Sequence, residues 1–280
     1  MPCYNEAMDF DRPATAVAPS TVIPEVNGAL LFSRYAYPPN KLGYCGPDDA
    51  QALLEYGATG TVDAGLGTLA RGFSGAWPYL ELIARATGIA DPLDRRVVEA
   101  YWVGNPLLEK VDMTMFGNSL MERFRPRSGK NWNNLAEAIP EGAVPHHNFH
   151  VFGVYPWVGL LTHENSEQPL RVLEKCRIRW GRVETVTGDQ VTVRSQPLTW
   201  NGRTLSLGEP RSETVAQGVA GVGFVHDLQP GEWVSMHWDW VCDRLTRRQL
   251  ATLRYYSQQQ LLVTNHRVAH PASAAILGAG

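Results

Sequence analysis

The stretch that decides the fold begins with residues 176–195, which read CRIRWGRVETVTGDQVTVRS. Hydrophobic and polar residues alternate on both sides of Gly188-Asp189, a dipeptide that suits the two-residue turn of a β-hairpin. A second turn signal, Asn201-Gly202, follows, and residues 231–245 supply a further strand in GEWVSMHWDWVCDRL. Short strands at this spacing indicate a small closed or partly open β-barrel.

Helical patterns flank the predicted barrel on both sides. Residues 246–264, TRRQLATLRYYSQQQLLVT, form an amphipathic run that predicts a C-terminal helix. Upstream, acidic helix starts, apolar faces and closing glycines predict a series of helices. We expect these at about residues 47–56, 76–88, 94–102, 107–124 and 132–139. The sequence therefore predicts an α+β protein with an all-α domain in front of a barrel and a helix.

Composition supports a division of the chain into two domains. Residues 1–170 carry 12 basic and 19 acidic residues, whereas residues 171–280 carry 13 and 9. We predict a flexible leader (1–27), an α-helical domain (28–168), a β-barrel plus helix (169–264) and an extended tail (265–280). The absence of a dense basic run makes nucleic acid a poor partner, and the absence of a long apolar run predicts no membrane insertion. The four cysteines form no CxxC pair, which favours the reducing cytoplasm.

Three features of the C-terminal part resemble the HypC/HupF hydrogenase maturation chaperones. They are Cys176 at the start of the first strand, the Gly-Asp hairpin, and Pro-Gly-Glu-Trp-Val-x-x-His at residues 230–237 followed by a helix. The resemblance covers about residues 174–264 and implies a small HypC-like, OB-type barrel. By position, Cys176 and His237 match the cysteine and histidine with which that family handles the Fe(CN)2(CO) unit of nickel-iron hydrogenases. The implied partners are a hydrogenase large subunit and the iron-scaffold maturation protein.

The helical part contains two further candidate sites. His146, His147 and His150 lie within five positions, and imidazole is a good ligand for iron, zinc, copper or haem. On a strand, His146 and His150 would share one face, whereas a helix would bring all three close together. The cluster is equally compatible with a structural role. Cys45 precedes a predicted helix start, where the helix dipole favours a reactive thiolate, although such a cysteine is often merely packed.

Two functions are compatible with these patterns. The first is an accessory factor for assembly of a nickel-iron hydrogenase, with iron, as Fe(CN)2(CO) or its precursor, held by Cys176 and His237. The alternative is a haem- or metal-dependent small-molecule enzyme in the helical domain, with the barrel as a docking module.

Overall fold

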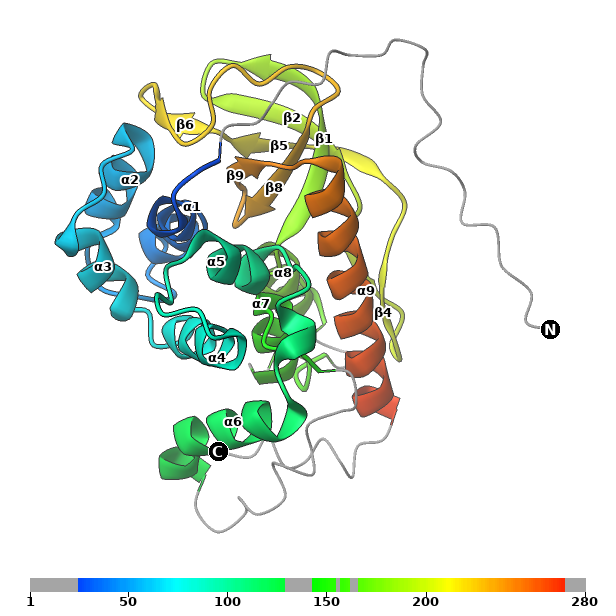
Figure 1. Cartoon of the computed structure of the whole chain (residues 1–280). Coiled ribbons are helices and arrows are strands. Elements are labelled where there is room, and N and C mark those ends of the chain that lie inside the picture. Colours follow the sequence, from blue (N-terminus) through cyan, green and yellow to red (C-terminus); the bar gives the residue numbers. More distant parts are fainter. Residues whose placement is uncertain (1–24, 129–142, 155–156, 162–165, 270–280) are drawn as a thin grey trace.

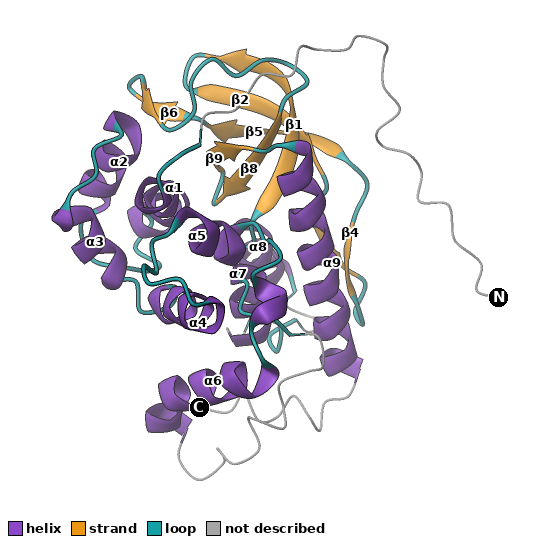
Figure 2. Ribbon diagram, viewed as in Figure 1, coloured by secondary structure: helices purple, strands orange, loops and turns teal. Residues whose placement is uncertain are grey.

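The computed structural model describes residues 25–128, 143–154, 157–161 and 166–269. Helices form the first part, strands the second, and one long helix follows the strands (Figures 1 and 2). The predicted helix at residues 132–139 lies outside the described residues. The elements before the strands are α1 (Gly28–Lys41), α2 (Ala50–Thr59), α3 (Ala64–Arg71), α4 (Trp77–Thr87), α5 (Arg95–Trp102), the 3-10 turn η1 (Leu108–Lys110), α6 (Met113–Ser128), α7 (His147–Phe149), the π-helical η3 (His150–Val154) and α8 (Glu167–Cys176).

Several helix ends follow the signals expected from the sequence. The Asp49 and Asp94 side chains accept hydrogen bonds from backbone N–H groups in the first turns of α2 and α5. Gly88 ends α4 with a φ of 70°, a left-handed conformation that glycine adopts without steric cost. Local capping therefore sets these boundaries.

Helix α1, the most buried of the early helices, was not predicted from the sequence. Pro38 and Pro39 lie in its last turns and concealed its helical pattern. The helix begins where the Asn27 side chain accepts a hydrogen bond from the Ala29 N–H at 2.8 Å. It contacts α2, α3 and α5 as well as the sheet, which buries nearly all of its faces (Figure 1).

The main sheet is a five-stranded ring with the order β1-β2-β5-β9-β8, in which β8 pairs again with β1. The β5–β9 junction consists of one parallel pair, Ala216 and Trp240, whereas the other neighbours are antiparallel. The predicted hairpin at Gly188-Asp189 is confirmed, because Thr187 pairs with Gln190. The strands are β1 (Arg179–Thr187), β2 (Gln190–Ser195), β3 (Leu198–Trp200), β4 (Leu205–Leu207), β5 (Arg211–Ala216), β6 (Gly218–Val219), β7 (Val222–Gly223), β8 (Trp233–His237) and β9 (Trp240–Arg244).

The structure corrects two boundaries near the C-terminus. A further strand, β9, follows His237 after a two-residue turn that lacks the usual glycine or asparagine. The final helix, α9 (Arg247–Ala269), extends past residue 264, so residues 265–269 are helical rather than an extended tail. Asn265 stabilises this extension, because its side chain exchanges two hydrogen bonds with the backbone of Leu205 in β4.

One hydrophobic cluster runs through both parts of the chain. It includes Phe32 and Trp102 from the helices and Val234 from β8. Polar contacts join α1 to the same strands: the Tyr35 hydroxyl lies 2.7 Å from the Ser235 hydroxyl. The division at residue 168 stays a prediction, and the shared core means that separating the parts would expose apolar surface on each.

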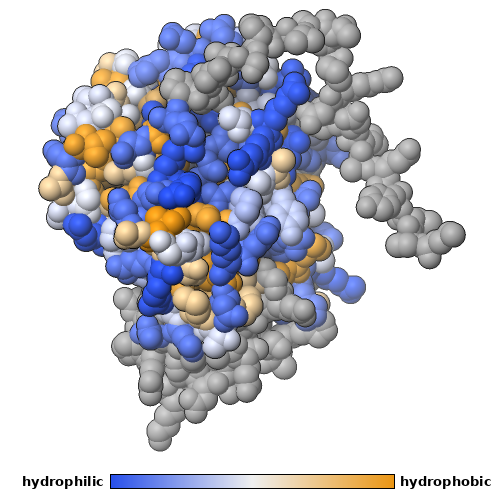
Figure 3. All heavy atoms as spheres, in the orientation of Figure 1, coloured by the Kyte–Doolittle hydropathy of each residue, from blue (hydrophilic) through white to orange (hydrophobic). Residues whose placement is uncertain are grey.

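The outer surface is mixed in character. On the face seen in Figure 3, hydrophobic residues form separate patches among hydrophilic ones. Exposed large apolar side chains include those of Leu42, Tyr44 and Leu262. Within the described parts of the chain, no helix is both long and apolar enough to cross a membrane.

Gly104 provides a test of how α5 is seated on α9. Its φ is 94°, and a Cβ atom there would lie 2.2 Å from the ring of Tyr256. We expect Gly104→Ala to lower the free energy of unfolding by more than ~2 kcal/mol, from overpacking and a disfavoured φ. Urea denaturation measures the change. Gly88→Ala is the matched control, because its φ is also positive but the space beside it is open, so it should cost only about 1 kcal/mol.

Candidate metal centre

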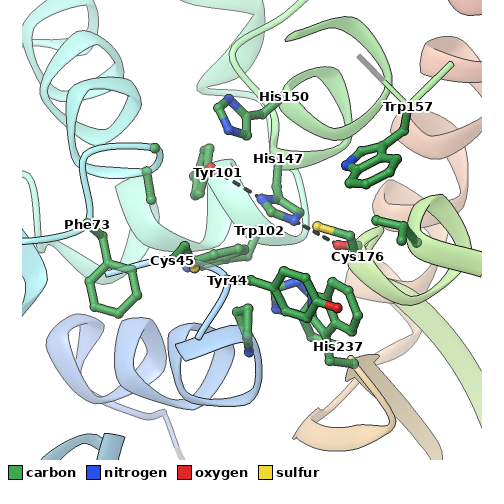
Figure 4. Close-up of a pocket in the computed structure, with 15 residues that line it drawn as sticks. Tyr44, Cys45, Phe73, Tyr101, Trp102, His147, His150, Trp157, Cys176 and His237 are labelled. Carbon is green, nitrogen blue, oxygen red and sulfur yellow. Dashed lines mark hydrogen bonds between the residues drawn. The ribbon is translucent and has the colours of Figure 1, made fainter. Parts of the chain in front are cut away.

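Three side chains from three different elements converge on one point of the structure. They are His147 at the start of α7, Cys176 at the end of α8 and His237 at the end of β8. Their potential ligand atoms all lie within 4.8 Å of one another (Figure 4). The exposed fraction is 6% for His147, 9% for Cys176 and 1% for His237, so the group is buried. The predicted Cys176–His237 pair is therefore adjacent in space, and His147 joins it from the helical part.

Cys176 occupies a different element from the one expected. It is the last residue of α8 rather than the first of a strand, and β1 begins at Arg179. The run before it is amphipathic, and its apolar face, including Leu173, is buried. This helical periodicity was present in the sequence and was overlooked.

The histidine cluster is helical, but its members separate. His146 caps α7 by accepting a hydrogen bond from the Asn148 N–H at 3.1 Å, and its ring stacks on Tyr256. His147 and His150 instead line a common cavity. The chain changes from α7 to the π-helical η3 at His150, and π-helical turns are frequent at functional sites. His146 therefore caps α7, and it does not line the cavity that the other two share.

Asn148 sets the position of α7 relative to the barrel. Its side-chain oxygen accepts the backbone N–H of Ile178 at 3.1 Å. Its side-chain nitrogen donates to the Ser257 hydroxyl of α9 at 2.9 Å. Because Asn148 adjoins His147 and Ile178 lies two residues after Cys176, these bonds bring the two candidate ligands together.

His237 is held in a tautomer suited to a metal ligand. Its Nδ1 lies 2.7 Å from the backbone oxygen of Tyr35, which can only accept, so Nδ1 carries the proton. The Nε2 atom is buried and has no hydrogen-bond partner among the described residues. An imidazole oriented through one nitrogen by a carbonyl, with the other free, is the usual arrangement of a metal-binding histidine.

His147 is oriented through both ring nitrogens. Nε2 lies 2.9 Å from the carbonyl oxygen of Cys176, and Nδ1 lies 3.2 Å from the Tyr101 hydroxyl. The carbonyl requires a proton on Nε2, so Tyr101 donates to Nδ1. A hydroxyl can donate or accept, so Tyr101 can retain its bond if the proton moves to Nδ1. That change would release Nε2 of His147 for a metal.

Burial keeps all three groups neutral in the metal-free protein. It lowers the pKa of His147 to about 4 and holds the pKa of His237 well below its usual value. Burial also raises the pKa of the Cys176 thiol to about 12, with a further contribution from Cys45 and an opposing one from Trp238. The neutral imidazoles can bind a metal ion directly, whereas the thiol must lose its proton to do so.

The triad opens on an aromatic cavity of about 280 Å³ (Figure 4). Cys45 and His150 also line this cavity, so it contains every predicted site residue except His146. Burial raises the pKa of Cys45 to about 12, opposite to the direction expected for a thiolate at a helix start. The other lining residues are Pro39, Tyr44, Phe73, Gly75, Ala76, Tyr101, Trp102, Trp157, Val172 and Trp238.

A buried charged network lies beside Cys176 and was not anticipated from the sequence. Glu174 binds both Arg177 and Arg179, which are 2% and 1% exposed. Arg179 also reaches Glu213 at 2.5 Å and Asp239 at 3.0 Å. The ion pair between Glu174 and Arg179 joins the end of α8 to β1 of the barrel. The sequence signal for this network was the pair of arginines on either side of the apolar residue Ile178.

Comparison with known proteins identifies a family but no activity. A family model described as "Family of unknown function (DUF6390)" matches residues 24–271, so the chain belongs to this family. No curated protein and no solved structure matches the chain.

The depressed histidine pKa values predict a pH-dependent stability for the metal-free protein. His146, whose pKa burial lowers to about 3, binds a proton near pH 6.5 only when unfolded. Its stabilising contribution is therefore complete above about pH 6.5 and is lost as the pH falls toward 3. Below pH 6 the loss approaches about 1.4 kcal/mol per pH unit. Urea denaturation between pH 7.5 and 5 with a chelator present should show the slope.

The His146→Gln variant is the comparison for this prediction. Glutamine can hydrogen-bond but does not titrate, so the slope should become shallower by up to about 1.4 kcal/mol per pH unit. If the free energy of unfolding falls equally with pH in the variant and the wild type, His146 does not have a lowered pKa in the folded protein.

Proposed function

We propose that this DUF6390 protein is an accessory factor that handles the iron unit of a nickel-iron hydrogenase, as Fe(CN)2(CO) or its precursor. The cargo would be held by Cys176 and His237, with His147 as a third ligand. One observation carries the proposal: Cys176 and His237, selected by family resemblance, have potential ligand atoms within 4.8 Å of each other. The Nε2 atom of His237 has no hydrogen-bond partner within the described ranges, which favours a ligand role at this point.

The donor set fits iron with small additional ligands. A thiolate and two imidazoles bind iron, zinc or copper, and three protein ligands leave coordination positions open. The cavity volume of about 280 Å³ lies near the lower end of ligand pockets, which span roughly 300–1,000 Å³. Such a space suits an iron with diatomic ligands better than a haem.

The HypC-like, OB-type identity of the barrel is part of the same proposal. The five-stranded ring, its Gly-Asp hairpin and a histidine on β8 support it. Cys176 lies at the end of a helix, whereas the family resemblance implies a position at the start of the first strand. In this chain the cysteine reaches the histidine because α8 ends against the barrel.

A second candidate is a metal-dependent enzyme acting on a small molecule. The observation that favours it is the extent of the cavity, which continues from the triad to Phe73 and His150. Because His237 comes from the barrel, that part would contribute to the site and would be more than a docking module. Turnover of a small molecule by the metal-loaded chain would select this function.

Substitution of Cys176 tests the carrier role. We expect Cys176→Ala to lower the affinity for Co²⁺, used as a spectroscopic probe, by more than about 100-fold and to remove the thiolate-to-metal charge-transfer band. The variant should also fail to support hydrogenase maturation in cells. Cys45→Ala is the control, because Cys45 lines the same cavity but does not belong to the triad. A wild-type protein without a cobalt–thiolate band, or a Cys176→Ala variant that matures hydrogenase normally, would refute the proposal.

The proposal also includes partners and a location. We expect the full-length chain, in the cytoplasm, to bind a hydrogenase large subunit and the iron-scaffold maturation protein. Pull-down with each purified partner, in the presence and absence of iron, measures the binding. Failure to bind either, together with small-molecule turnover, would favour the enzyme.

A further inference from the structure

Trp238 follows His237 directly and lies at the tip of the β8–β9 hairpin. Trp238 and Asp239 have φ angles of 46° and 58°, values that favour glycine or asparagine at the two positions of this turn. Residues kept in sparsely populated conformations tend to occur where the surrounding structure requires them for function. The unusual turn therefore raises the question of what Trp238 does there.

Contacts from the end of α8 hold the hairpin tip in place. The backbone N–H of Trp238 donates to the carbonyl oxygen of Lys175 at 2.9 Å. The Asp239 carboxylate pairs with Arg179 at 3.0 Å and also with the Lys175 ammonium group. Lys175 precedes Cys176, so these contacts fix Trp238 relative to the candidate thiolate.

The indole ring of Trp238 is half-buried beside the triad. Tyr44 stacks on it with ring centroids 4.2 Å apart and an interplanar angle of 17°. Trp238 also packs against the apolar cluster that contains Cys176, and both residues line the cavity. Its Nε1 atom is buried and has no acceptor in hydrogen-bonding geometry among the described residues. A buried indole N–H normally finds a partner, so this donor is available to a stronger acceptor than a neutral thiol.

A thiolate at Cys176 would supply the acceptor that Trp238 lacks among the described residues. A neutral thiol accepts hydrogen bonds weakly, whereas a thiolate accepts them strongly. The Trp238 backbone is hydrogen-bonded to Lys175, the residue before Cys176, and the indole lines the same cavity as the sulfur. Metal binding would generate the thiolate, because a coordinating thiol loses its proton.

We propose that Trp238 is a positioning residue whose indole N–H donates a hydrogen bond to the Cys176 sulfur once that sulfur is bound to a metal. This inference rests on the proposed function, because it requires a metal on Cys176. Hydrogen bonds to a metal-bound sulfur withdraw electron density from it and tune the metal–sulfur bond. The strained turn serves to aim the donor.

The test uses the full-length protein loaded with Co²⁺. Trp238→Phe keeps an aromatic ring for Tyr44 to stack on but removes the N–H. We expect its cobalt–thiolate charge-transfer band to move to lower energy, because the sulfur becomes more electron-rich. Trp200→Phe is the matched control. Trp200 has a buried Nε1 without a partner in the part of the chain that the structure describes, and it packs against the same cluster, but it does not line the cavity. Its band should coincide with that of the wild type.

A second measurement needs no variant and guards against a substitution that prevents folding. Resonance Raman spectra of the wild-type cobalt protein should show a metal–sulfur stretch that shifts when H2O is exchanged for D2O, since the indole hydrogen exchanges. An unshifted stretch, or a Trp238→Phe band identical to the wild-type band, would overturn the role of Trp238 and leave the metal site intact. A wild-type protein without any cobalt–thiolate band would overturn the proposed function itself.

Discussion

The buried side-chain amide of Asn148 is the constraint on which the candidate site depends. It is fully buried and bonds at the same time to the backbone before β1 and to a hydroxyl of α9. A buried amide that lost these partners would be costly, so the three segments are held in one arrangement. His147 adjoins this residue, and its distance from Cys176 follows from the same bonds.

Two kinds of polar interior lie side by side around Cys176. The triad is neutral, because burial opposes charge on each of its groups. The neighbouring network is charged, and each buried arginine has an acidic partner. Removing one partner from such a network would leave an uncompensated buried charge, so the intact ion pairs hold the end of α8 against the barrel. The backbone at Cys176 is therefore held in place, whereas its thiol loses its proton only when a metal binds.

The candidate site belongs to both parts of the chain. His147 comes from the helical part, His237 from the barrel, and Cys176 from the helix that joins them. Two sites that were separate in the sequence interpretation are therefore one cavity, which also includes Cys45 and His150. A carrier of this form would hold its iron with ligands from one chain and keep the remaining coordination positions for small ligands or a recipient protein.

The sequence by itself determined the features that depend on near neighbours. The Gly188-Asp189 hairpin, the helix start at Asp49 and the left-handed Gly88 were predicted because each is stabilised within a few residues. The Cys176–His237 pair was found through family resemblance. Only the tertiary structure showed that His147 joins the Cys176–His237 pair, that His146 does not line the same cavity, and that Trp238 lies beside the thiol. These relations join residues far apart in the chain, and they depend on how whole faces pack, which periodicity and turn signals do not encode.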